Sequence, residues 1–247
     1  MTTMMTTPHR FVRLLASVMS EPEARLAAAH GADIIDCKNP AEGALGALAC
    51  SVVASIREAV PRHVPVSATI GDLPAHPATV VRAAAAMAAT GCDIVKIGFF
   101  PGGDAEATIR SLGQEIAPHT PLVAVLMADA PLDLALVAHL GDAGFAGVML
   151  DTAVKDGRTL CDHRTPAELG RFVGEAQAAG LFAGLAGSLR VGQIPELLAL
   201  EPDVLGFRGA LCTGRDRQQA LDAAAMSAVR RAIPHEFERT PSLEIAS

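Results

Sequence analysis

Asp36 and Lys38 lie two residues apart in the segment Gly31-Ala-Asp-Ile-Ile-Asp-Cys-Lys-Asn-Pro40, where a short apolar run leads into a charged exit. Because side chains alternate between the two faces of a β-strand, a strand here would direct both groups to the same side. A lysine amine can attack a carbonyl carbon, and a carboxylate beside it can balance charge and transfer protons. We therefore interpret Lys38 as a catalytic amine.

Two further lysines occupy comparable positions. Lys96 lies in a second predicted strand, and Lys155 follows a third one that ends at Asp151. Burial or a neighbouring cation lowers the pKa of a lysine, which frees the amine as a base or a nucleophile. Lysines that converge should therefore lower one another's pKa, with Asp36 and Asp151 holding the remaining charge. The alternative is a set of lysine–aspartate ion pairs with a purely structural role.

Eight short apolar segments alternate with eight helical segments, the last helix being predicted over residues 217–232. No linker is long enough to separate two domains. The alternation predicts an α/β protein with a single (β/α)8 TIM barrel at residues 11–233, between a flexible N-terminal arm at 1–10 and a polar C-terminal tail at 234–247. A doubly wound open sheet is the alternative, but the first strand lacks the glycine-rich dinucleotide turn that follows it in such folds.

A shared spacing at the helix-to-strand junctions predicts which residues face the barrel interior. It occurs in Gly31-x-Asp33, Gly91-x-Asp93, Gly144-x-Ala146, Gly180-x-Phe182 and, without glycine, Glu201-Pro-Asp203. Counted from the third residue of each unit, positions one, three and five share a strand face. In the seventh strand these are Ala183, Leu185 and Gly187.

This register directs charge from four strands toward one mouth of the barrel. The charged residues concerned are Asp36, Lys38, Lys96, Asp151 and Arg208. Active sites of TIM barrels lie at the C-terminal ends of the strands, where these residues fall. We expect Lys38 to be the reachable nucleophile, level with Asp151, and Lys96 to be a base one layer deeper, level with Asp36.

Glycines follow the seventh and eighth predicted strands, in Gly187-Ser188 and in Gly206-Phe-Arg208-Gly209. In TIM barrels the loops after these strands often bind phosphate through backbone N–H groups. Glycine lets the backbone approach the anion closely, and Arg208 could clamp it. The sequence thus predicts phosphate binding by Gly187, Ser188, Gly206, Arg208 and Gly209, although the glycines could also be ordinary turn residues.

Composition and spacing argue against several other kinds of partner. The net charge is −7 without a basic cluster, so we expect no nucleic acid and no membrane partner. The cysteines and histidines are scattered without metal-ligand spacing, and we expect no metal and no cofactor. The start lacks the apolar core of a secretion signal, which favours a cytoplasmic protein.

Asp129 is interpreted as the cap of the next helix, with a place in the site as the alternative. A homo-oligomer remains open.

Several long motifs resemble the (5-formylfuran-3-yl)methyl phosphate synthase family, also called 4-(hydroxymethyl)-2-furancarboxaldehyde-phosphate synthase. They include the opening segment with Glu42-Gly-Ala-Leu-Gly46, Ser67-Ala-Thr-Ile-Gly-Asp72, Val95-Lys-Ile-Gly98, Leu150-Asp-Thr-Ala-Val-Lys-Asp-Gly157, Ala186-Gly-Ser188 and Arg208-Gly-Ala210. The resemblance extends over residues 12–232. Cys37 stands where the family leads us to expect valine, on the strand face that points away from the mouth.

The resemblance implies a metal-free lyase of methanofuran biosynthesis. Such an enzyme joins two molecules of glyceraldehyde 3-phosphate into a phosphorylated furan, with loss of phosphate and water. By the same likeness, Lys38 would form a Schiff base, Lys96 would accept a proton, and Asp36, Asp151 and Lys155 would supply further acid–base steps.

Two other functions are compatible with the same residues. A class I (Schiff-base) aldolase or a triose-phosphate isomerase-like barrel acting on another phosphosugar would need only one or two of these groups. A barrel that binds a phosphosugar without chemistry is the non-enzymatic alternative. Formation of a furan chromophore and covalent trapping by borohydride would separate the three.

Overall fold

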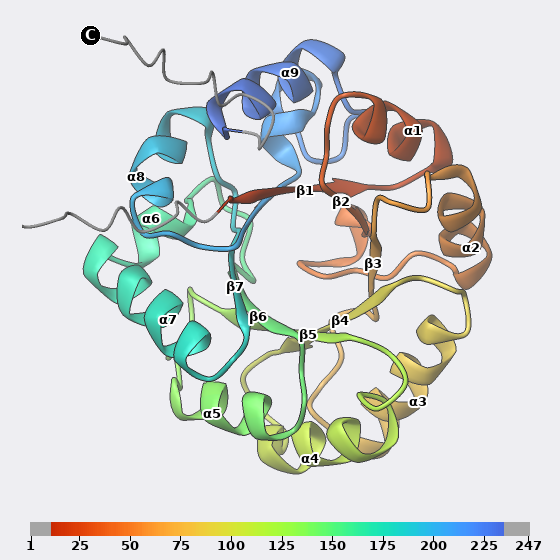
Figure 1. Ribbon diagram of the computed structural model, residues 1–247, viewed down its shortest axis with the longest axis vertical. Coiled ribbons are helices and arrows are strands. Elements are labelled where there is room, and N and C mark those ends of the chain that lie inside the picture. Colours follow the sequence, from red (N-terminus) through yellow and green to blue (C-terminus); the bar gives the residue numbers. More distant parts are fainter. Residues whose placement is uncertain (1–10, 235–247) are drawn as a thin grey trace, which may run out of the picture.

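Eight parallel strands pair in sequence order, β1 to β8, and close into a barrel that the helices surround (Figure 1). The computed structural model of the protein describes residues 11–234. The predicted TIM barrel is confirmed, and the doubly wound open sheet is wrong because β1 pairs with both β2 and β8. The expected arm at residues 1–10 and all but the first residue of the expected tail lie outside the described residues.

The strands and helices alternate along the chain with short connections. The strands are β1 Arg13–Val18, β2 Ile34–Cys37, β3 Val66–Thr69, β4 Ile94–Phe99, β5 Leu122–Met127, β6 Gly147–Asp151, β7 Phe182–Leu185 and β8 Val204–Phe207. The helices are α1 Glu21–Ala29, α2 Cys50–Ala59, α3 Pro77–Ala88, α4 Ala105–Glu115, α5 Ala135–Asp142, α6 Leu160–His163, α7 Pro166–Ala178, α8 Ile194–Leu198 and α9 Ala223–Ala232. Short 3₁₀ turns add η1 Pro40–Glu42, η2 Val191–Gln193, η3 Gly209–Leu211 and η4 Thr213–Arg215.

The repeated junctions close the N-terminal end of the barrel. Their glycines adopt left-handed φ angles between 76° and 81°, as a helix C-terminus commonly requires, and Glu201 takes the same conformation with φ 53°. The aspartate just before a strand accepts a backbone N–H from the strand that precedes it in the sequence. The bonds run from Leu14 to Asp33 at 2.7 Å, from Val66 to Asp93 at 2.8 Å and from Ala183 to Asp203 at 2.8 Å.

Two apolar cores lie on opposite faces of the sheet. The larger one fills the layer between the strands and the helices. The smaller one lies inside the barrel and includes Leu15, Ile34, Val125, Met149 and Val204. This inner core forms an apolar floor beneath the charged residues at the C-terminal ends of the strands, where burial strengthens electrostatic interactions.

The predicted register of β7 is wrong by one residue. Ala183 and Leu185 belong to the outer core, whereas Phe182 and Ala186 pack on the inner one. The physical reason is a glycine in the neighbouring strand, β6. Phe182 pairs with Gly147, where a Cβ atom would lie 2.5 Å from the phenyl ring, so only glycine leaves room for that ring inside the barrel.

The predicted last helix begins six residues too early. Helix α9 starts at Ala223, where the carboxylate of Asp222 accepts the Ala225 N–H at 2.7 Å as an N-cap. Residues 217–222 instead form an irregular segment, and its first residue, Arg217, lines the C-terminal mouth together with Arg215 of η4. The loop after β6 also contains a helix, α6, that the sequence did not predict.

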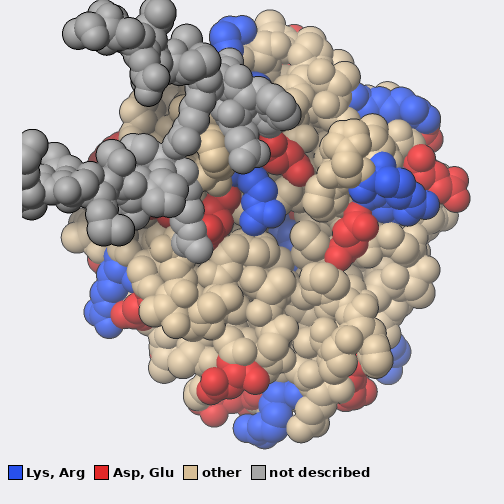
Figure 2. Space-filling model, in the orientation of Figure 1, with Lys and Arg blue, Asp and Glu red and all other residues tan. Residues whose placement is uncertain are grey.

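Charged side chains of both signs are mixed on the face seen in Figure 2. Uncharged residues cover most of this face, and the Lys and Arg side chains lie beside Asp and Glu side chains without forming a field of one sign. Within residues 11–234, no helix is long and apolar enough to cross a membrane.

Candidate active site

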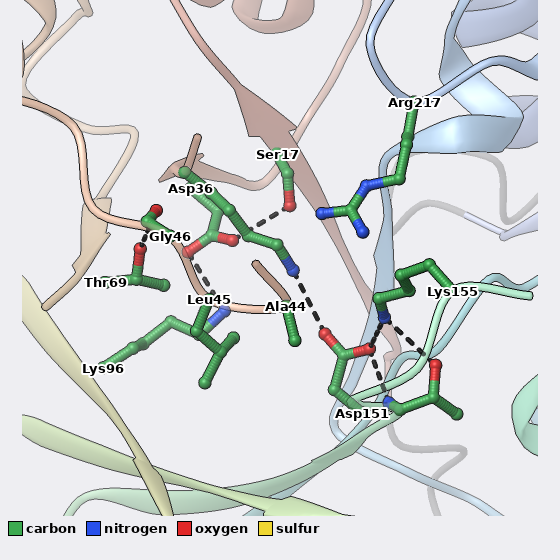
Figure 3. Close-up of polar contacts among 12 residues, drawn as sticks. Ser17, Asp36, Ala44, Leu45, Gly46, Thr69, Lys96, Asp151, Lys155 and Arg217 are labelled. Atoms are coloured by element: carbon green, nitrogen blue, oxygen red, sulfur yellow. Dashed lines mark hydrogen bonds and ion pairs between the residues drawn. The ribbon is translucent and has the colours of Figure 1, made fainter. Parts of the chain in front are cut away.

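Asp36 anchors the deeper of two polar clusters at the mouth of the barrel. Its side chain is fully buried and accepts hydrogen bonds from Lys96 Nζ at 3.0 Å and from Ser17 Oγ at 2.9 Å (Figure 3). It also accepts a hydrogen bond from Ser67 Oγ at 2.7 Å. These partners come from β1, β3 and β4, the strands next to β2 and one beyond. Both carboxylate oxygens of Asp36 are thus occupied, and Lys96 is held with 4% of its surface exposed.

Asp151 joins two lysines in the second cluster. One carboxylate oxygen lies 3.1 Å from Lys38 Nζ, and the other lies 2.7 Å from Lys155 Nζ and accepts the Thr152 N–H at 2.7 Å. Lys155 also donates to the Thr152 hydroxyl at 3.0 Å, whereas Lys38 has Asp151 as its single partner among the described residues. Lys38 is therefore the less constrained of the two amines.

Burial and charge compete at this cluster. Burial alone would raise the pKa of the Asp151 carboxyl, but the ammonium groups of Lys155 and Lys38 outweigh it and hold that pKa well below its usual range. Burial lowers the pKa of Lys155 and outweighs the opposing attraction of Asp151, and the Lys38 cation lowers it further. Asp151 is consequently an ionised partner, and Lys155 is the group whose proton is easier to remove than that of an ordinary lysine.

A cavity of about 510 Å³ opens above both clusters. All the predicted site residues line it, namely Asp36, Lys38, Lys96, Asp151, Lys155, Gly187, Ser188, Gly206, Arg208 and Gly209. The backbone N–H groups of Gly187, Ser188 and Gly209 donate to no acceptor among the described residues. Free N–H groups at such loops can bind an anion.

Arg208 does not have the geometry of the predicted phosphate clamp. Its guanidinium binds Glu23 through both Nη atoms, at 2.6 and 3.2 Å, and its remaining N–H groups donate to the backbone oxygens of Ser17, Arg217 and Gln219. An arginine has five N–H donors, so all of them are used. The buried carboxylate of Glu23 competes successfully for this side chain, and a phosphate clamp needs another arginine.

Asp129 does not cap the next helix. Leu134 stands at the start of α5 without a side-chain cap. The Asp129 carboxylate instead accepts the N–H groups of Ala153 and Val154 at 2.8 and 2.7 Å. These two residues lead from β6 to Lys155, so Asp129 fixes the segment that brings the third lysine to Asp151.

Sequence reasoning missed several residues that the fold brings to the mouth, among them Ser17, Ser67 and Arg217. Ser17 and Ser67 hydrogen-bond Asp36, and only their place in strands on either side of β2 signals this. Arg217 lines the cavity because the chain is irregular there, whereas a predicted helix hid it. No group of three or more His, Cys, Asp or Glu residues within 11–234 is arranged to hold a metal ion.

Solved structures with this architecture are distant in sequence. Phosphoribosyl anthranilate isomerase from Thermus thermophilus superposes with a TM-score of 0.64 and 18% identity, covering 90% of this chain and 98% of that one. A 3-hexulose-6-phosphate synthase superposes with a TM-score of 0.61 and 20% identity, covering 90% of this chain and all of the other. At this identity the likeness shows the fold alone.

Sequence relatives are much closer. The family model described as 4-HFC-P synthase matches residues 14–230. The (5-formylfuran-3-yl)methyl phosphate synthase of Methanocaldococcus jannaschii is 40% identical over 217 residues, covering 83% of this chain and 92% of that protein. The enzyme of the same name from Methanococcus maripaludis is 41% identical over 219 residues with the same coverage, and a relative from Methylorubrum extorquens is 42% identical over 217 residues.

These matches extend over nearly the whole barrel and include every strand that carries a charged residue to the mouth. The predicted family is confirmed. The chain belongs to the 4-HFC-P synthase family of (5-formylfuran-3-yl)methyl phosphate synthases and is an enzyme.

Proposed function

We propose that this enzyme condenses two molecules of glyceraldehyde 3-phosphate into (5-formylfuran-3-yl)methyl phosphate, through a Schiff base on Lys38, in the biosynthesis of methanofuran. The observation that carries the proposal is the pair of lysine–aspartate clusters, Lys38–Asp151–Lys155 and Lys96–Asp36, that face one cavity. The names of the relatives support the product. The scattered free cysteines favour action in the cytoplasm.

The overall reaction needs proton transfers but no oxidant or reductant. Two triose phosphates contain the atoms of one furan phosphate, one phosphate and two waters. Formation of a Schiff base joins the Lys38 nitrogen to a carbonyl carbon, and the carbonyl oxygen leaves as water. The resulting enamine adds to the carbonyl of the second triose. Ring closure, loss of phosphate and dehydration form the furan, and hydrolysis of the Schiff base takes up one water and frees the Lys38 amine.

Each of these steps moves a proton at carbon or oxygen, which accounts for several amines and carboxylates in one cavity. Lys96 is suited to accept a proton from carbon, because Asp36 holds its amine at a fixed position in the floor of the cavity. Lys155 is suited to acid–base steps near neutral pH because its pKa is lowered. Asp151 stabilises the positive charge that passes between the two neighbouring lysines.

The backbone N–H groups of Gly187, Ser188 and Gly209 are our candidates for phosphate binding. Gly206 lines the same cavity, where its missing side chain leaves room for the inner core. A Cβ atom at Gly206 would lie 3.1 Å from Cβ of Ala186 and 3.5 Å from side-chain atoms of Leu15 and Met149. Substrate charge would thus be held by the loops after β7 and β8 while the carbonyl reaches Lys38.

Borohydride trapping with glyceraldehyde 3-phosphate tests the assignment of the nucleophile. We expect the wild type to gain a covalent adduct that peptide mapping places on Lys38, and the Lys38→Arg variant to gain none and to form no furan. Lys96→Arg and Lys155→Arg are the matched controls and should still be trapped on Lys38, while furan formation falls by about 100-fold or more, as expected for loss of an acid–base group.

An adduct on Lys96 or Lys155, or trapping in Lys38→Arg, would contradict the role of Lys38. The ultraviolet absorption of the furan separates this reaction from that of an aldolase or an isomerase. Activity should also survive exhaustive treatment with a chelator, and a loss restored only by a divalent metal would contradict the mechanism.

A further inference from the structure

Arg217 reaches into the cavity from the irregular segment between η4 and α9. Its Nη2 atom donates to the backbone oxygen of Gly43 at 2.8 Å, in the connection between β2 and α2. Figure 3 shows its guanidinium directed toward the same space as Lys155 and Ser17. Arg217 therefore bridges the loops after β8 and β2 at the mouth of the barrel.

Arg217 and Arg208 differ in the use of their donors. All the N–H groups of Arg208 bind protein acceptors, as described above. Arg217 makes one hydrogen bond to the described part of the chain and leaves its other guanidinium N–H groups without an acceptor there. Burial lowers the pKa of Arg217, although Asp151 opposes the effect. A half-buried guanidinium with spare donors beside a cavity is well suited to bind an anion.

The charge of the cavity also favours the binding of an anion. Seven lysine or arginine side chains line it against three aspartates, although the chain as a whole carries a net charge of −7. The reaction proposed above brings two phosphate groups into this one cavity. The backbone N–H groups after β7 and β8 would bind one of them. Of the arginines that could bind the second, Arg190 and Arg215 are exposed, whereas Arg217 is half-buried in the wall of the cavity.

We propose that Arg217 binds the phosphate of the second triose phosphate, in a subsite distinct from the backbone N–H groups of Gly187, Ser188 and Gly209. This inference rests on the proposed function, because only that reaction brings two phosphates into the cavity. The open donors of Arg217 indicate where the second phosphate binds. The ligand class is a phosphate monoester.

The segment that carries Arg217 is held from two sides. Arg208 donates to the backbone oxygens of Arg217 and Gln219 at 2.9 and 2.8 Å, and Glu23 accepts the Leu221 N–H at 3.3 Å. The buried Arg208–Glu23 pair thus fixes the main chain from below. On the other side, Asp72 accepts two N–H groups of the loop that contains Gly43, the residue that receives the Arg217 side chain. Arg208 and Glu23 are positioning residues in this arrangement.

Calorimetric titration with glycerol 3-phosphate tests the subsite apart from the chemistry, because this probe has no carbonyl group to react with Lys38. We expect two molecules to bind per wild-type chain and one per Arg217→Gln chain. Arg217→Lys should bind two, the second with about 10-fold lower affinity, because lysine keeps the charge but loses the bidentate geometry. Arg231→Gln, on the exposed end of α9, removes the same charge away from the mouth and should leave both sites unchanged.

Kinetics give a second readout. Arg217→Gln should raise KM for glyceraldehyde 3-phosphate by about 10- to 100-fold, the range expected for a lost charge-assisted contact, while Lys38 is still trapped by borohydride. Two undiminished probe sites in Arg217→Gln, or a single site in the wild type, would overturn the inference even if the furan is made. If the wild type binds two probe molecules but makes no furan, and Arg217→Gln binds only one, the result would support the subsite and contradict the proposed reaction.

Discussion

Asp151 is shared by two lysines, and this sharing decides how the group titrates. The carboxylate stays ionised across the neutral range, since its pKa is held well below normal by the two ammonium groups. Lys155 is subject to opposite influences, because burial and Lys38 lower its pKa while Asp151 raises it. The state of Lys155 at neutral pH therefore depends on the carboxylate beside it.

Replacement of Asp151 by asparagine should move the titration of Lys155 to lower pH. The amide keeps the shape of the side chain but removes the negative charge that stabilises the ammonium form, so the pKa of Lys155 should fall further below its usual range. NMR titration of lysine side chains labelled at Cε measures this shift, with Lys155→Arg identifying the resonance.

Asp156→Asn is the matched control, because Asp156 is one residue from Lys155 but pairs with Arg158 at the surface. We expect no change there in the pKa of Lys155. A pKa that rises in Asp151→Asn would show that the attraction of Asp151 does not govern this amine.

At the scale of elements, β7 determines how the inside of the barrel is filled. Met149 of β6 pairs with Gly184, and a Cβ atom at Gly184 would lie 2.4 Å from Cγ of Met149. Large and small side chains therefore alternate between these two strands. This packing holds the floor of the cavity directly below Asp151.

Gly184→Ala should destabilise the protein by about 1–3 kcal/mol, the usual cost of an overfilled core. The loss of stability should be smaller when Met149 is also replaced by alanine. A double-mutant cycle measured by chemical denaturation should therefore give a favourable coupling energy of about 0.5–3 kcal/mol. Gly174→Ala in α7 is the control, since a Cβ atom there meets no atom within 4 Å and alanine is the better helix former. Additive effects of the two substitutions in β6 and β7 would mean that Gly184 does not face Met149.

The whole molecule combines an acidic chain with a cationic mouth. The cations that line the cavity come from the loops after β2, β6, β7 and β8 and from β4, so no single element carries them. An anionic substrate is attracted by this local field although the chain is negative overall.

Ionic strength should consequently affect substrate capture more than the chemical steps. A rise from about 0.02 to 0.2 M salt shortens the Debye length from more than 20 Å to less than 10 Å, so we expect KM for glyceraldehyde 3-phosphate to increase several-fold with little change in kcat. Initial rates of furan formation at fixed pH measure both constants. Wild-type binding of uncharged glyceraldehyde, followed by borohydride trapping, should be insensitive to salt. A KM that does not change with salt would contradict electrostatic capture.

The sequence by itself determined the order and type of nearly all the elements, and the inward direction of Asp36, Lys38, Lys96 and Asp151. These follow from local rules, because the alternation of side chains along a strand and the glycine at each helix end act within a few residues. The ion pairs of Lys38 with Asp151 and of Lys96 with Asp36 agree with the predicted levels in the barrel.

Only the tertiary structure decided the direction of the two arginines and the phase of β7. Arg208 lies at a strand position that faces the mouth, but its long side chain turns toward the strongest hydrogen-bond partner that it can reach. That partner is Glu23, which is 185 residues away in the sequence. Arg217 faces the cavity because those same contacts hold its backbone, and Phe182 points inward because Gly147 on the neighbouring strand leaves space. Each outcome depends on a residue from another element, and spacing within one segment contains no information about it.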